Sequence, residues 1–222
     1  MEWHITDAQS LATIDREIGG AFALMHPNHD ILSPASPNEY RHFLLAEYEI
    51  IKRVIYATGD FEYKSLIEFS ERSLQAAAAA LASRSSIIVD TTTVQAAIAK
   101  QAQNNFANPV YCAMSVQTRP QKEKTSAAWG METLANRYPE GIFVVGQIPT
   151  ALTSLIDLIV AEKIQPVLII ATPPKFTDID ETKQSLKQLS IPHITIKNHK
   201  GGAIVAAAIL DALIDLAWEA YG

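Results

Sequence analysis

The feature that most constrains the fold is an alternation of short apolar runs with longer amphipathic stretches. The apolar runs occupy residues 86–90, 109–116, 141–146, 166–172 and 193–197. Runs that are apolar throughout are typical of strands buried on both faces of a sheet. Strand–helix alternation with short connections favours right-handed crossovers. We therefore predict an α/β protein with a doubly wound, mostly parallel five-stranded sheet and helices on both faces.

The part of the chain before the first apolar run is predicted to be helical. An amphipathic helix over residues 6–20 is expected to stop at Gly19-Gly20, and a second helix over 37–60 is expected to end at Gly59. A third helical stretch covers 65–83, and the proline-containing segment 25–37 indicates a surface connection. A chain of 222 residues suits one large core. We expect one domain over 1–222, with an extension at 1–36 and a core at 37–222.

Composition excludes several functional classes. The net charge of −6 argues against non-specific nucleic-acid binding, and the lone Cys112 excludes an intramolecular disulfide. No apolar run approaches the roughly 18–20 residues that span a bilayer, and the N-terminal segment lacks the apolar core of a signal peptide. We expect a cytoplasmic protein that binds neither nucleic acid nor membrane.

A parallel sheet of this kind binds ligands in the crevice beyond the carboxyl ends of its strands. Four loops follow predicted strands and are rich in hydroxyl groups, glycine, proline or cations. They are "DTTT" at 90–93, "GQIPT" at 146–150, "ATPPKF" at 171–176 and "KNHKGG" at 197–202.

The loop at 197–202 has two interpretations. Lys197, His199 and Lys200 precede Gly201-Gly202, which open a long apolar helix. A helix N-terminus preceded by glycines and cations suits a carboxylate or phosphate ligand. The alternative is a basic turn at the surface.

The loop at 146–150 also has two interpretations. Gly146 and Pro149 can build a tight strand-to-helix connection. Alternatively, Gln147 and Thr150 project into the crevice and bind a ligand. The sequence contains no glycine-rich nucleotide motif and no G-x-S-x-G hydrolase motif.

A metal site is not expected. His26 and His29 lie three residues apart beside Asp30, but the segment is rich in proline and offers no evident third ligand. A solvated loop is the preferred interpretation.

Several consecutive motifs resemble those of the precorrin-8X methylmutases, enzymes of cobalamin biosynthesis. They occur in the family's order from about residue 37 to the C-terminus, which leaves the segment before residue 34 outside the resemblance. The motifs are "FSERSLQAAAAAL", "VDTTTVQAAI", "NPVYC", "TSAA", "VVGQIPTAL", "PPKFTDIDETKQSL" and "HKGGAIVAAAILDAL".

The resemblance implies a homodimeric, flavodoxin-like protein that moves a methyl group between adjacent carbons of a corrin precursor. The product would have the hydrogenobyrinate skeleton, and neither an organic cofactor nor a metal is implied. Such an isomerisation is helped by protonation of the ring, so the site must supply an acid and a shaped cavity. The candidate substrate-binding residues are Asp90, Thr92, Thr93, Thr125, Ser126, Gly146, Gln147, Thr150, Lys175, His199, Lys200, Gly201 and Gly202.

Departures from the family pattern concern the acid and a cation. In "RVIYATGD", Tyr56 stands where the family has the histidine regarded as its acid, and His42 precedes Phe43 where Ser-Phe is usual. Thr92 and Thr125 replace larger side chains, and Gln147 replaces asparagine. Tyr56 and His42 are the candidate catalytic residues, and on one unbroken helix they lie about 21 Å apart.

Three functions remain open at this point. The leading hypothesis is a precorrin-8X methylmutase, acting on a cobalt-free or a cobalt-containing substrate. The alternatives are a non-catalytic relative that binds a tetrapyrrole, and a structural protein with an empty crevice.

Overall fold

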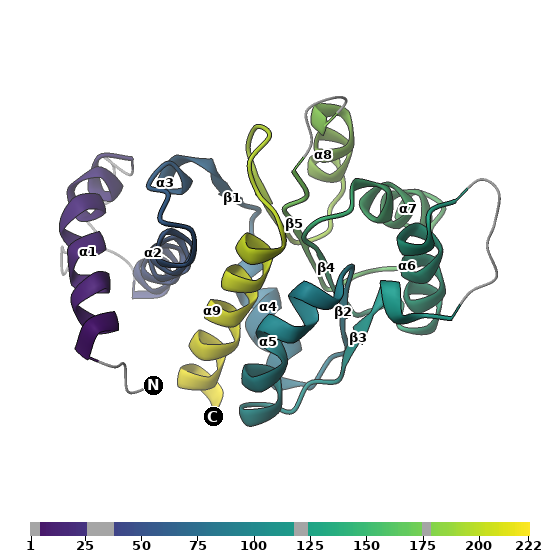
Figure 1. The fold of residues 1–222 in the computed structure, drawn as a ribbon, viewed down its shortest axis with the longest axis horizontal. Helices are drawn as coiled ribbons and strands as arrows, with labels where there is room; N and C mark the ends of the chain where they lie inside the picture. Colours follow the sequence, from purple (N-terminus) through teal and green to yellow (C-terminus); the bar gives the residue numbers. More distant parts are fainter. Residues whose placement is uncertain (1–4, 26–37, 118–123, 175–178) are drawn as a thin grey trace.

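The computed structural model of the protein describes residues 5–25, 38–117, 124–174 and 179–222. Six strands form one mixed sheet, which lies between two layers of helices (Figure 1). The strands are β1 (Ile67–Phe69), β2 (Ile87–Val89), β3 (Val110–Cys112), β4 (Ile142–Val145), β5 (Leu168–Ala171) and β6 (His193–Ile196). The helices are α1 (Ile5–Met25), α2 (Asn38–Thr58), α3 (Tyr63–Leu66), α4 (Ser73–Ala82), α5 (Thr92–Asn104), η1 (Ala113–Ser115), α6 (Ser126–Arg137), α7 (Pro149–Val160), α8 (Ile179–Gln188) and α9 (Ala203–Tyr221).

The five predicted strands are confirmed as a continuous parallel set. Their spatial order is β3-β2-β4-β5-β6, the order of a flavodoxin-like sheet. The strand order reverses between β2 and β4, which pair in parallel with Ile87 opposite Ile142. Ligands of such folds bind at this switch point, so the carboxyl ends of β2 and β4 locate the candidate site.

The helix predicted over 65–83 is wrong in its first part. That segment forms the end of α3, the strand β1 and then α4, with Arg72 in a left-handed conformation before α4. β1 pairs antiparallel with β6, placing Ile67 opposite Ile196, and so adds a sixth strand to the sheet. Burial of Ile67 against the core favours the strand over helical continuation.

The first helix also differs from its prediction. α1 continues through Gly19-Gly20 to Met25, so the expected stop is wrong, whereas α2 ends at Thr58 as predicted. α1 packs on α2, where Ile14 and Ile18 are buried and the hydroxyl of Tyr48 donates to Asp15 at 2.8 Å. These tertiary contacts outweigh the low helix propensity of two glycines. Residues 26–37, predicted to be a surface connection, lie outside the described part of the chain.

Each face of the sheet has its own apolar core. Along β2, Ile87 and Val89 join the core beneath α2, α4, α5 and α9, whereas Ile88 joins the core beneath α6 and α7. Figure 1 shows these two helical layers on opposite sides of the sheet, with α9 between α2 and α5. None of the described helices is long and apolar enough to cross a membrane.

Replacing Gly130 tests the packing of α6 against η1. A Cβ at this buried position would overlap the carbonyl oxygen of Ala113. Overpacking costs about 1–3 kcal/mol, so we expect Gly130→Ala to lower the melting temperature by several degrees in calorimetry. Thr133→Ala, on the exposed side of the same helix, should remain near wild type. A rise in the melting temperature of Gly130→Ala, as for an unobstructed helical glycine, would contradict this packing.

Candidate functional site

Asp90 joins the two strands at the switch point. It follows β2, is fully buried, and its Oδ2 accepts hydrogen bonds from the backbone N–H groups of Gln147 (2.7 Å) and Ile148 (2.8 Å). Its Oδ1 has no hydrogen-bond partner among the described residues. Charge-assisted bonds of this kind are strong, so Asp90 fixes the loop after β4. Its burial points to a role in holding that loop.

The glycines before α9 allow the chain to pass close to the end of β5. The N–H of Gly202 donates to the carbonyl of Thr172 at 2.7 Å, and the Thr172 hydroxyl donates back to the Gly202 carbonyl at 3.1 Å. Gly201 has φ of +139°, and a Cβ there would overlap the Thr172 carbonyl. Only glycine satisfies both conditions. Gly202 has no side chain that could cap α9, and the N–H of Ala203 donates instead to Gln147 Oε1 at 3.4 Å.

The two lysines of the loop at 197–202 are paired with acidic side chains. Lys200 Nζ lies 2.6 Å from Asp60 Oδ2 and 2.8 Å from Glu62 Oε2, and Lys197 Nζ lies 3.6 Å from Glu68 Oε1. The hydrogen bond from Lys200 lowers the pKa of Asp60, and the same pair raises the pKa of Lys200. The structure therefore ties Lys200 to the turn after α2, in addition to any contact with a ligand.

A buried lysine of α8 donates hydrogen bonds to backbone carbonyls of the same loop and of the strand before it. Lys183 is 5% exposed, and its ammonium donates to the carbonyls of Ile196 and Asn198. His199 lies exposed in this loop. Sequence reasoning missed Lys183, because its partners are backbone atoms of a different element.

Hydroxyl groups gather at the start of α6 and α7. The hydroxyls of Thr125 and Thr150 lie 2.8 Å apart, and Thr125 also caps α6 by accepting from the N–H of Ala128 at 3.2 Å. The structure thus brings together two candidates that are 25 residues apart in sequence. The other exposed hydroxyls predicted for the site, at the starts of α5 and α6, are Thr92, Thr93 and Ser126.

The remaining candidate residues are Gly146, Lys175 and the two histidines of the segment 25–37. Gly146 is buried, and a Cβ there would crowd Val94 and Ala206. Lys175 lies outside the described residues. So do His26 and His29, and the expectation that they form no metal site stays a prediction.

A pocket of about 440 Å³ opens between α2, α5 and α9. Tyr56 of α2 lines it and is 38% exposed, and Ile204 of the first turn of α9 also lines it and is 51% exposed. The Tyr56 hydroxyl donates to Asp7 Oδ1 of α1 at 2.7 Å, which raises the pKa of the phenol. Other residues of the lining include Arg53, Lys100 and Asp211.

Two charged side chains of the pocket lining, Arg53 and Asp211, lie close to Asp215. Arg53 Nη1 is 2.7 Å from Asp215 Oδ2 and 3.8 Å from Asp211 Oδ2, and Gln101 Nε2 donates to Asp215 Oδ1 at 2.8 Å. Burial, followed by the neighbouring charge of Asp215, raises the pKa of Asp211 to about 6. Sequence reasoning missed this group. Its one signal was a pair of aspartates one helical turn apart in an otherwise apolar stretch.

The two candidate acids do not meet within one chain. α2 is continuous from Asn38 to Thr58, so the fourteen residues between His42 and Tyr56 correspond to a rise of about 21 Å.

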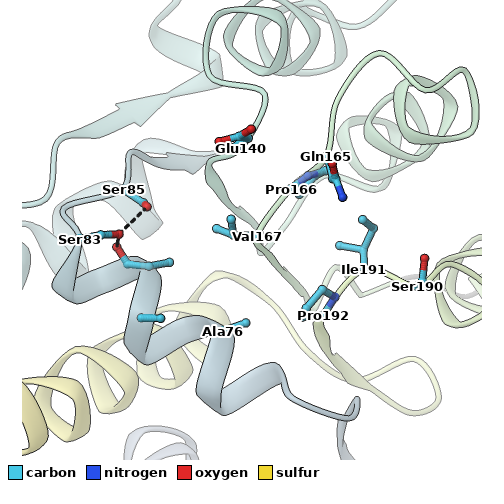
Figure 2. Close-up of a pocket in the computed structure, with 12 residues that line it drawn as sticks. Ala76, Ser83, Ser85, Glu140, Gln165, Pro166, Val167, Ser190, Ile191 and Pro192 are labelled. Atoms are coloured by element: carbon cyan, nitrogen blue, oxygen red, sulfur yellow. Dashed lines mark hydrogen bonds between the residues drawn. The ribbon is translucent and has the colours of Figure 1, made fainter.

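Another pocket, of about 690 Å³, lies at the amino ends of the parallel strands (Figure 2). Its lining comes from α4 and from segments that precede β4, β5 and β6, and Glu140 is its one ionisable residue. The amino ends of parallel strands are not where such sheets bind ligands, so we do not assign the site here.

The comparisons with known proteins agree on one family. The sequence profile of the precorrin-8X methylmutases matches residues 7–216. The chain is 34% identical to a cobalt-precorrin-8 methylmutase from Synechocystis over 187 residues, covering 78% of this chain and 86% of that protein. It is 33% identical to one from Methanocaldococcus jannaschii over 170 residues, covering 76% and 79%.

A solved structure gives the same result. The crystal structure of a precorrin-8X methylmutase from Thermus thermophilus superposes with a TM-score of 0.77 and 25% identity, covering 99% of this chain and all of that one. The profile match begins at residue 7, so most of α1, which the motifs left outside the resemblance, lies within the matched region. The chain therefore belongs to the precorrin-8X methylmutase family.

Proposed function

We propose that the protein is a methylmutase that moves a methyl group between adjacent ring carbons of a precorrin-8-type tetrapyrrole. The observation that carries this proposal is a juxtaposition. The loop at 197–202 runs directly into α9, and Ile204 of that helix lines the same pocket as Tyr56. Tyr56 occupies the place of the family's acid, so the pocket is where the reacting part of the ring would lie.

The charges around the pocket suit a ring that carries carboxylates. α9 begins beside the pocket without a side-chain cap at Gly202, and a helix N-terminus favours negative charge. Lys100 of α5 lies exposed at the pocket. Because Lys197 and Lys200 are paired with acids, we assign the attraction of ligand carboxylates mainly to the start of α9 and to Lys100.

The reaction needs a proton donor and no change of oxidation state. Tyr56 is poorly suited to this role, because its hydroxyl already donates to Asp7 and its pKa is raised. We include no cofactor or metal in the proposal. Relatives carry names with and without cobalt, and a cobalt ion would enter as part of the substrate.

Turnover tests the proposed function directly. We expect the purified protein to convert precorrin-8X, its cobalt form, or both to a product of unchanged mass and altered absorption spectrum, because an isomerisation moves atoms without adding any. Titration with hydrogenobyrinic acid should shift the absorption of that compound. A protein that gives neither the conversion nor the shift would leave the empty crevice as the correct interpretation. Binding without conversion would favour the non-catalytic relative.

Substitution of Tyr56 tests where the ring lies. We expect Tyr56→His to raise kcat at pH 7, because a histidine with a reference pKa near 6.5 donates a proton more readily than a tyrosine near 10. Tyr56→Phe is the matched control, since it also removes the bond to Asp7 but adds no acid. Equal kcat for these two variants would show that the reacting carbons lie away from this position.

We also propose that the protein is a homodimer, as the resemblance implies. Sedimentation equilibrium at micromolar concentration should then give twice the mass of one chain. Loss of activity in His42→Ala would support a site completed by the partner subunit, because the continuous helix α2 separates residues 42 and 56 by about 21 Å. A monomeric mass would refute this assembly.

A further inference from the structure

We propose that Asp211 is the catalytic acid of this pocket, the side chain that protonates the tetrapyrrole while the methyl group moves. The inference rests on the proposed function and names a residue for a role that Tyr56 fills poorly. It begins from the geometry of α9, in which Ile204, Ala208 and Asp211 recur at helical spacing along the wall of the pocket.

The position of Asp211 gives it access to a ligand. Its side chain is 32% exposed and lines the same pocket as Tyr56. Asp60 pairs with Lys200, and Arg53 lies close to Asp211 and Asp215, so α2 and α9 run antiparallel along the pocket. A ring that is bound at the start of α9 and contacts Tyr56 would therefore also lie beside Asp211.

The neighbouring Asp215 cannot take this role. It is 6% exposed as a residue, and its oxygens accept from Arg53 at 2.7 Å, Gln101 at 2.8 Å and Asn105 at 3.5 Å. These three donors occupy both oxygens of the Asp215 carboxyl group. Arg53 is thereby directed toward Asp215, and its Nη1 stays 3.8 Å from Asp211. Asp211 and Asp215 lie one helical turn apart, and their different surroundings suit Asp211 to proton transfer and Asp215 to the ion pair with Arg53.

The groups that face Asp211 come from three helices. α2 contributes Arg53 and Tyr56, α5 contributes Lys100, and α9 itself contributes Asp215. α4, which also packs on α9, carries no titratable residue. Burial and the charge of Asp215 outweigh the attraction of Arg53, so the pKa of Asp211 is raised to about 6. The carboxyl keeps its proton below that pH and loses it as the pH rises through about 6.

The step is balanced as an isomerisation. The Asp211 carboxyl transfers its proton to the conjugated ring, and the ring becomes cationic. The methyl group then leaves one ring carbon with its bonding electrons and forms a bond to the adjacent carbon. Loss of a proton from the rearranged ring to the Asp211 carboxylate restores the acid. No oxidant, reductant or second substrate is consumed.

The test compares Asp211→Asn with wild type and with Asp211→Glu. A general acid contributes about 10²–10⁴ in rate, so we expect Asp211→Asn to lower kcat by at least about 100-fold while hydrogenobyrinic acid still binds. In wild type, kcat/KM should fall as the pH rises through about 6. Asp211→Glu should restore part of kcat and keep this alkaline limb. Asp157→Asn, an exposed aspartate on α7, is the matched control and should behave as wild type.

The outcomes separate the two proposals. If Asp211→Asn turns over within about threefold of wild type and keeps the alkaline limb, Asp211 is not the acid, although the methylmutase function stands. If Asp211→Asn loses ligand binding together with kcat, its role is in binding and the inference also fails. If wild type neither binds hydrogenobyrinic acid nor converts a precorrin, the proposed function itself fails.

Discussion

A buried ion pair between Arg53 and Asp215 joins the helices on one face of the sheet. The two side chains are 13% and 7% exposed, and Gln101 and Asn105 complete the hydrogen bonding of the carboxylate. The cluster joins α2, α5 and α9. Removing one partner of such a pair typically costs about 3–5 kcal/mol, because the other charge stays buried. The pocket between these helices, and the environment of Asp211 within it, both depend on this contact.

At the carboxyl edge of the sheet, hydrogen bonds to backbone groups hold the loops together. Asp90 accepts two N–H bonds from the loop after β4, while Gln147 of that loop accepts from the first N–H of α9. The end of β5 is tied to the same place through Thr172 and Gly202. The start of α9 is thus fixed relative to β2, β4 and β5. A helix N-terminus held in this way needs no reorganisation when an anionic group approaches it.

Sequence alone predicted the elements whose signal is local. The five parallel strands are apolar on both faces, so the sequence alone located each of them. β1 was missed because three residues between two helices carry no periodicity, and only pairing with β6 makes them a strand. The partners of Lys200 and Arg53 lie 140 and 162 residues away in sequence. No local pattern encodes such contacts, so the ion pairs and the environment of Asp211 emerged only from the fold.

The two edges of the sheet have a consequence for aggregation of the protein. β1 and β3, the outermost strands, are each three residues long, and β1 carries Glu68 at its centre, where it pairs with Lys187 and Lys197. An edge this short offers a second chain few backbone groups to pair with, and a charge in its middle penalises close approach. The sheet therefore ends in strands that discourage edge-to-edge aggregation, although its interior strands are among the most apolar segments of the sequence.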